Sequence, residues 1–272
     1  MARRLQINPP VENSRDWLEK GARFGHFTKG VLYGLIGALS LRVAIGSGGE
    51  VAGQQEAAQV VQRQPFGVVL LIAIAIGLFG YAVWRLIEGV KGTPRKGGEG
   101  KGMAHRATSV ASALVNGSLA VAVLQMALGD GGGGGASSWV GKLLEQPFGA
   151  VLLGLIGAAI VAAGFVQFYK AYTKAFLEDF RYNAMSPRER RWITRAGQVG
   201  YSARGVVFPI VGYGLLRAAL DQNPGEARDT REALLEIASS SNGQLLLGLV
   251  AVGLLAFGLF MVASARYRAI TM

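Results

Sequence analysis

Few residues in this sequence could do metal or acid–base chemistry. The chain of 272 residues has no cysteine and only two histidines, His26 and His105, and neither lies near an acidic cluster. Zinc and related metals need several His, Cys or carboxylate ligands in a fixed geometry. We therefore predict no metal site and no cofactor. We expect both histidines to be polar residues at the membrane interface. The alternative is that they ligate a metal.

Motifs of catalysis are equally scarce. No set of serine, histidine and acidic residues is apparent that could form a nucleophilic triad. The glycine-rich run 129–135 lacks the Gly-Lys-Ser/Thr ending of a phosphate-binding loop, so we interpret it as a flexible turn. The sequence predicts no catalytic residue and a protein that is not an enzyme.

Charge is the chemistry that remains. The net charge is +11, yet only 17% of the residues are charged and 51% are hydrophobic. Soluble domains have about 25% charged residues, so the composition favours a membrane protein. A strongly basic chain could also bind nucleic acid, and the position of the charges along the chain decides between the two.

Four apolar stretches are long enough to cross a membrane, which takes about 20 residues. They are Phe66–Trp84, Ala107–Gly129, Pro147–Tyr169 and Ile237–Ala265, the last being apolar from about Gly243. Two shorter runs become spans of about Gly25–Ile45 and Gly200–Leu220 if the flanking Lys and Arg side chains reach the headgroups. We predict an all-α integral membrane protein with six transmembrane helices, and no Asp or Glu inside a span.

The basic residues divide unevenly between the two sides of such a bundle. With the N-terminus inside, the inner segments hold 22 of the 28 Lys and Arg residues, as the positive-inside rule requires. We predict a multi-pass membrane protein with both termini in the cytoplasm. The positive side then faces the anionic headgroups of the lipid bilayer, and no nucleic-acid partner is expected.

The chain repeats itself three times. The segment 25–30, Gly-His-Phe-Thr-Lys-Gly, recurs at 200–205 as Gly-Tyr-Ser-Ala-Arg-Gly, and the Gln-Pro-Phe-Gly of 64–67 recurs at 146–149. We predict a single membrane domain, 1–272, made of three tandem repeats at about 14–90, 101–172 and 187–268. Two spans per repeat insert all copies the same way up, so we expect three parallel two-helix repeats in a pseudo-threefold arrangement.

Glycine spacing and short amphipathic segments predict further detail. Gly30, Gly34 and Gly37 share a helix face and indicate close helix packing, as do Gly157 and Gly164. Amphipathic stretches around Trp17 and Trp192 are interpreted as short helices parallel to the inner surface, with both tryptophans as interfacial anchors. On the outer side, a short helix is expected after Asp229 and a counterpart over Gln54–Gln64.

These repeats resemble a bacterial membrane family known as domain of unknown function number 1206. The resemblance is carried by the Gly-aromatic-x-x-basic-Gly motif of 25–30 and 200–205 and by the Gln-Pro-Phe-Gly segments, and it covers about residues 14–268. The middle copy departs most from the motif and has Ser112 at the basic position. The resemblance implies a fold and a location in the bacterial inner (plasma) membrane, and it implies no activity.

The repeat alignment makes Arg42, Gln125 and Arg217 equivalent, each in the outer part of the first helix of its repeat. An arginine facing lipid at mid-bilayer costs about 2.5–3.5 kcal/mol or more. We therefore expect these side chains to reach the outer headgroups or to pair with an acid such as Asp221 or Glu236. The alternative is a partial polar ring on the axis that binds anions or lipid phosphate.

Two functions from different classes fit this sequence. The first is a non-catalytic scaffold or accessory subunit for a membrane protein partner, because no acidic residue, metal set or nucleotide motif lies in a span. The alternative is a small channel or transporter with a path along the pseudo-threefold axis. The polar residues Asn116, Ser118 and Gln125 of the third span favour that alternative.

Overall fold

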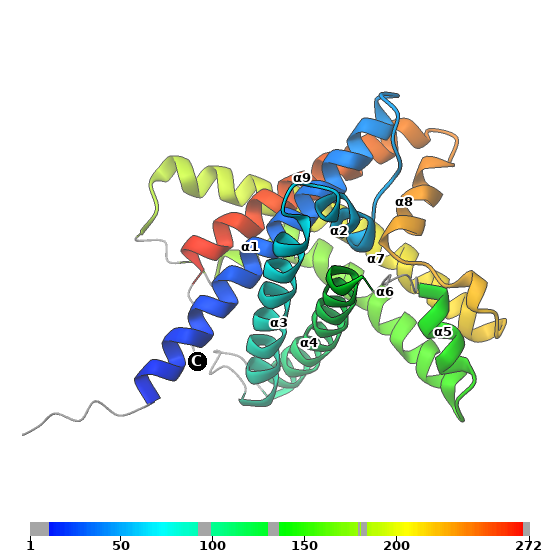
Figure 1. Ribbon diagram of the computed structural model, residues 1–272, viewed down its shortest axis with the longest axis horizontal. Helices are drawn as coiled ribbons and strands as arrows, with labels where there is room; N and C mark the ends of the chain where they lie inside the picture. The colour runs from blue at the N-terminus through cyan, green and yellow to red at the C-terminus, as the bar shows by residue number, and fades with distance from the viewer. Residues whose placement is uncertain (1–10, 92–98, 130–135, 179, 181–183, 269–272) are drawn as a thin grey trace, which may run out of the picture.

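Six long helices form the body of the protein in the computed structural model, which describes residues 11–91, 99–129, 136–178, 180 and 184–268. Each contains a segment long and apolar enough to cross a membrane, which confirms the predicted number of spans. The long helices are α1 (Val11–Ala44), α3 (Gly67–Lys91), α4 (Glu99–Leu128), α6 (Gly149–Thr173), α7 (Pro187–Leu220) and α9 (Gly243–Tyr267) (Figure 1).

A nine-residue helix lies between the two long helices of every repeat. These short helices are α2 (Gln54–Gln62), α5 (Ala136–Leu144) and α8 (Thr230–Ala238). Two 3₁₀ turns, η1 (Ala175–Leu177) and η3 (Pro224–Glu226), complete the described elements. Helices α2 and α8 were expected, whereas α5 was not, because its sequence begins after a glycine run and carries no capping signal. Each repeat thus consists of a long, a short and a second long helix.

The structure corrects the expectation of separate helices on the inner surface. The amphipathic stretch around Trp192 forms the first turns of α7, which begins at the Ser186 capping box and continues for 34 residues without a break. The corresponding stretch around Trp17 belongs in the same way to α1, also 34 residues long. Such helices measure roughly 51 Å, so their first turns extend past a hydrocarbon core of about 30 Å. The separate helix is wrong because nothing in 187–200 interrupts the backbone hydrogen bonds.

The long helices pack most extensively across repeat boundaries. Helix α3 packs on α4, α6 on α7, and α1 closes back onto α9. Within repeats, α1 packs on α3 and α7 on α9, while α4 and α6 of the middle repeat scarcely touch. The helices therefore follow one another in cyclic order with a single interruption between α4 and α6.

Glycines allow the closest of these approaches. A Cβ added at Gly258 of α9 would lie 2.7 Å from the backbone nitrogen of Gly34 in α1, and one at Gly212 of α7 would lie 2.7 Å from the carbonyl oxygen of Gly157 in α6. Contacts this short exclude any side chain, so the glycine faces set the separation of the helices. The predicted close packing is confirmed at Gly30, Gly37, Gly157 and Gly164, where an added Cβ would lie 2.5–2.9 Å from a neighbouring helix, whereas a Cβ at Gly34 would have nothing within 4 Å.

The Gln-Pro-Phe-Gly segments form the same turn in two repeats. Phe66 and Phe148 adopt left-handed φ angles of 63° and 62°, and the glycine that follows each donates its N–H to the carbonyl of Gln64 or Gln146. A Cβ on Gly149 would lie 1.8 Å from the carbonyl oxygen of Leu143. The motif therefore lets the second long helix start directly against the end of the short helix.

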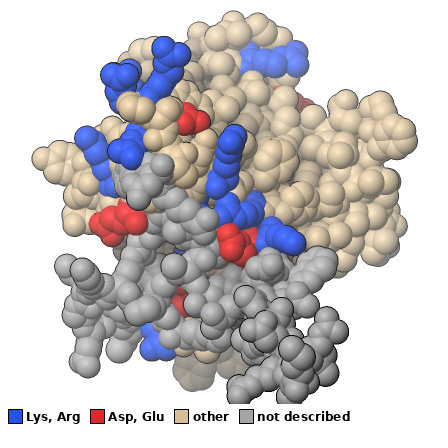
Figure 2. Space-filling view, turned by 90° about the vertical axis from the view of Figure 1, so that its left-hand side faces the viewer, with Lys and Arg blue, Asp and Glu red and all other residues tan. Residues whose placement is uncertain are grey.

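Buried apolar side chains run through both ends of the bundle, and Ile193, Phe257 and Phe260 toward the inner end are at most 1% exposed. One buried cluster joins the long helices to α2 and α8, with Ile36, Leu71, Leu234 and Leu254 fully or almost fully buried. The inner end is different in character. Figure 2 looks onto the left-hand side of Figure 1, where the first turns of α7 and the last turns of α9 lie, and shows Lys and Arg side chains spread over that face. Positive charge is thus added to the apolar core at this end.

Candidate functional site

Five basic side chains from five separate segments come together in the inner half of the bundle. The charge of Lys29 interacts with those of Arg85 and Arg204, and the charge of Lys170 interacts with those of Arg85, Arg204 and Arg268. We call this group the inner basic cluster: Lys29 of α1, Arg85 of α3, Lys170 of α6, Arg204 of α7 and Arg268 just after α9.

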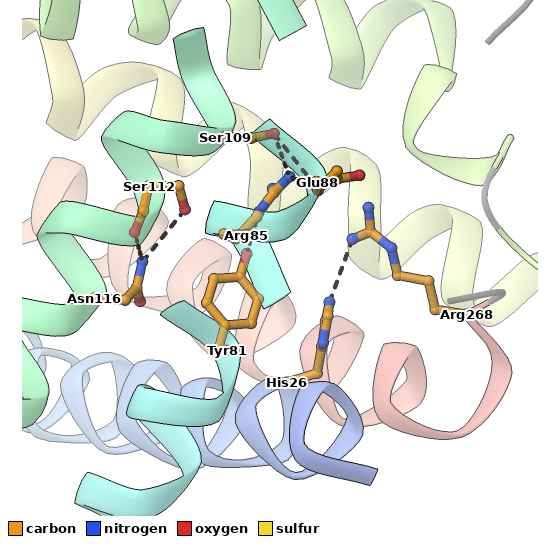
Figure 3. Close-up of polar contacts among 8 residues, drawn as sticks. All are labelled: His26, Tyr81, Arg85, Glu88, Ser109, Ser112, Asn116 and Arg268. Atoms are coloured by element: carbon orange, nitrogen blue, oxygen red, sulfur yellow. Dashed lines mark hydrogen bonds and ion pairs between the residues drawn. The ribbon is translucent and has the colours of Figure 1, made fainter. Parts of the chain in front are cut away.

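Arg85 is the best-partnered member of the cluster (Figure 3). Its Nη1 lies 2.7 Å from Glu88 Oε2 and 3.4 Å from Ser109 Oγ of α4, and its Nε donates to Tyr81 Oη at 3.1 Å. Ser109 in turn donates to Glu88 at 3.3 Å. The Glu88 carboxylate therefore neutralises Arg85. It also overturns the expectation that no acid lies in a span, because α3 extends past the apolar run and includes Glu88.

Lys29 and Arg204 occupy the basic position of the repeated motif, and both lie over aromatic rings. Lys29 Nζ is 4.3 Å from the ring centre of Tyr81. The guanidinium carbon of Arg204 is 4.5 Å from the ring centres of both Phe208 and Phe257. Such cation–π contacts are worth roughly 0.5–2 kcal/mol each, and they leave the formal charge in place.

Three members of the cluster have no counter-charge among the side chains that the structure describes. Lys29, Lys170 and Arg204 make no ion pair or hydrogen bond there, and Arg204 Nε is buried without an acceptor. All three side chains are partly buried, and withdrawing a cation from water is costly unless it is paired. The cluster therefore has the charge and the free donors to hold an anion.

His26 borders the cluster and is fully buried. Its Nδ1 lies 2.7 Å from the carbonyl oxygen of Ala22, and its Nε2 is 3.4 Å from Arg268 Nη1. The ring also contacts Tyr81 and Trp84 at centroid distances of 5.1 and 5.2 Å. No group of three metal-ligating side chains occurs in the described part of the chain. The His105 side chain lies outside the described residues, so its expected role stays a prediction.

The middle repeat contributes uncharged polar groups to the same region. Ser112, which replaces the motif cation, accepts from Asn116 Nδ2 at 3.3 Å through its hydroxyl and at 2.6 Å through its carbonyl. Asn116 is buried, whereas Ser118 and Gln125 of the same helix are exposed. Of the three polar residues that favoured a transport path, only Asn116 therefore points into the protein.

The second long helices of the first two repeats carry polar residues at the same two positions. By the offsets between the Gln-Pro-Phe-Gly segments, Arg85 corresponds to Gln167 and Glu88 corresponds to Lys170. Gln167 is buried, and its Oε1 has no hydrogen-bond partner among the described residues. This register was the signal in the sequence that could have revealed Arg85 and Lys170, since the same two positions carry polar residues in two repeats.

The equivalent outer residues lie at the surface. Arg42, Gln125 and Arg217 are all exposed, and Arg217 Nη2 pairs with Asp221 Oδ2 at 3.1 Å within its own helix. No hydrogen bond or ion pair joins the three in the part of the chain that the structure describes. Trp192 is half-exposed, and the Trp17 side chain is outside the described residues, so interfacial anchoring by the two tryptophans stays a prediction.

Six apolar helices that enclose a cationic cluster define a multi-pass α-helical membrane protein with an interior polar site. The family described as Domain of Unknown Function (DUF1206) matches the chain three times, at residues 24–92, 107–174 and 199–268. The chain belongs to this family, and the predicted tandem repeat is confirmed.

The chain is also similar to a Bacillus subtilis (strain 168) protein named "Uncharacterized protein YxxB". The two are 32% identical over 261 residues, which cover 96% of this chain and 94% of the other. No solved structure matches the chain.

Proposed function

We propose that this protein is a non-catalytic accessory or scaffold protein of the bacterial plasma membrane that holds an anionic group in its inner basic cluster. The observation that carries the proposal is the set of three interior cations, Lys29, Lys170 and Arg204, without an acid beside them in the described structure. A bound anion would offset the cost of withdrawing these partly buried charges from water. Its two termini are cytoplasmic in this proposal, and its partner is another membrane protein.

The apolar packing of the outer half supports a binding site over a conducting path. Ile36, Leu71, Leu234 and Leu254 come from four different helices and fill the region outward of the cluster. An ion that entered from the inner side would meet this apolar packing beyond Asn116, in which Ser40 of α1 is a buried polar side chain. The channel or transporter remains the second candidate, because Ser109, Ser112 and Asn116 continue the polar region along one face of α4.

Binding of a soluble anion tests the proposal directly. Inorganic phosphate should raise the thermal unfolding temperature of the purified protein in mild detergent, since a ligand that binds only the folded state stabilises it. The double variant Lys29→Gln plus Arg204→Gln should lose at least nine-tenths of that shift. The matched control, Arg42→Gln plus Arg217→Gln, removes the same charge from exposed positions and should keep the shift.

Flux and partner measurements separate the two candidate functions. Proteoliposomes should show no anion leak above protein-free liposomes, and a mild-detergent pull-down should recover one stoichiometric membrane partner. Reproducible anion flux that Lys29→Gln plus Arg204→Gln abolishes would favour the channel and contradict the accessory role. A phosphate shift of equal size in both double variants would contradict the assignment of the site.

A further inference from the structure

The bundle is open on one side, between α4 and α6. Adjacent long helices pack together everywhere else in the cyclic order, but these two scarcely touch. They are also the least buried of the six spans. Large apolar side chains lie exposed along both, among them Leu114 and Val121 of α4 and Leu155 and Phe165 of α6. The middle repeat thus leaves two membrane-embedded helix faces without a protein neighbour.

This open side leads to the inner basic cluster. Lys170, on the inner end of α6, interacts electrostatically with Arg85 of α3 and Arg204 of α7. From the other side, Ser109 of α4 contacts Arg85 at 3.4 Å. One turn before Lys170, the buried Gln167 has an unpartnered amide oxygen. Cationic and polar groups of α4 and α6 therefore meet at the inner end of the gap between these two helices.

The two features together select the chemistry of the occupant. The cations favour a negatively charged ligand. The site lies within membrane spans, where the nearest abundant anion is the phosphate of a lipid headgroup. The exposed apolar faces of α4 and α6 match acyl chains that extend outward from that headgroup. A free phosphate would satisfy the charge but would leave these apolar faces without a ligand.

We infer that the inner basic cluster binds the phosphate of an anionic phospholipid that enters from the inner leaflet between α4 and α6. This inference rests on the proposed anion site and specifies its ligand. Lys170 and Arg204 lie beside the phosphate, and the acyl chains lie along the open faces of the two helices. The bound lipid completes the ring of helices at the place where α4 and α6 do not pack.

Native mass spectrometry of the full-length protein in detergent tests the inference. Delipidated protein is mixed with phosphatidylglycerol, with phosphatidylcholine, or with glycerol 1-phosphate as the headgroup without chains. We expect one phosphatidylglycerol to bind at least tenfold more tightly than either of the other two. Lys170→Gln plus Arg204→Gln should weaken that binding at least tenfold, while Arg42→Gln plus Arg217→Gln should leave it unchanged.

The outcomes separate this inference from the function on which it rests. If inorganic phosphate stabilises the protein but phosphatidylglycerol neither binds nor competes, the lipid is wrong and the anion site stands. If neither binds, both proposals fall. Equal binding of phosphatidylglycerol and phosphatidylcholine would also overturn the lipid inference. So would undiminished phosphatidylglycerol binding by Lys170→Gln plus Arg204→Gln. Arg204→Lys keeps the charge and should keep lipid binding, which distinguishes loss of charge from loss of folding.

Discussion

Glu88 sets how much positive charge the inner basic cluster presents. Its carboxylate lies 2.7 Å from Arg85, and the two side chains are only 10% and 18% exposed. Removing one partner of a buried ion pair leaves the other charge uncompensated, which costs roughly 3–5 kcal/mol in proteins. The same change adds one free cation to a group that already holds three without a counter-charge.

Glu88→Gln should therefore change stability and anion binding in opposite directions. We expect a lower unfolding temperature without phosphate, and a larger phosphate-induced rise than in the unmodified protein, because one more cation faces the anion. Thermal unfolding in detergent over a phosphate titration measures both effects. Glu236→Gln is the matched control, since the Glu236 side chain is 51% exposed and surface pairs contribute about 0–1 kcal/mol. A smaller phosphate shift in Glu88→Gln would show that Glu88 supports anion binding instead of limiting it.

At the scale of elements, the glycine face of α1 offers a test of helix packing with an internal control. A Cβ at Gly30 would lie 2.8 Å from the carbonyl oxygen of Gly258 in α9, whereas a Cβ at Gly34 would have nothing within 4 Å. The two glycines are one turn apart on the same helix and differ only in what faces them.

Gly30→Ala should destabilise the protein by about 1–3 kcal/mol, because α1 and α9 must separate to admit the methyl group. Gly34→Ala should be neutral or stabilising by up to about 1 kcal/mol, since alanine favours the helix over glycine. Resistance to unfolding in increasing fractions of sodium dodecyl sulfate measures both. Equal losses in the two variants would mean that the contact between α1 and α9 does not set stability.

The sequence predicts those helices whose signals lie within the helix itself or beside it. The spans are encoded by runs of apolar residues, and α8 by the cap of Asp229, whose side chain accepts from the backbone N–H groups of Arg231 and Glu232. Helix α5 lacks such a signal and was missed. The continuity of α7 was also missed, because its first ten residues have the amphipathic pattern of a surface helix while no residue there ends the helix.

The register of the second helices marks Arg85 and Lys170 as polar positions, but the grouping of the five cations could not be predicted, because contacts between repeats bring them together. Lys29 and Arg204 stand 175 positions apart, and each was recognised as a motif residue without any indication that it faces the interior. Hydropathy placed Lys29 at the end of a span, where its side chain could reach the headgroups. In the structure the aromatic rings of Tyr81 and Phe257, contributed by the second helices of two repeats, lie against these two cations.

At the scale of the whole molecule, the direction of insertion decides which leaflet the cluster faces. An even number of spans puts both termini on one side. We predict that this side is cytoplasmic, because its segments hold 22 of the 28 Lys and Arg residues. The structure places Arg85, Lys170 and Arg268 toward that end, near the C-terminal ends of α3, α6 and α9. The lipid inference requires this orientation, because the cytoplasmic leaflet is the anionic one.

Reporter fusions in a bacterial host should show both termini in the cytoplasm. A green fluorescent protein fused after Met272 should fluoresce, and alkaline phosphatase fused there should be inactive, because the phosphatase folds only after export. Alkaline phosphatase fused after Ser239, in the outer turn between α8 and α9, should be active and serves as the matched control. Active phosphatase at Met272 together with inactive phosphatase at Ser239 would reverse the orientation. The basic cluster would then face the outer leaflet. Helices α1 and α7, which carry charge at both ends, would have inserted with their more basic end outside, contrary to the positive-inside rule.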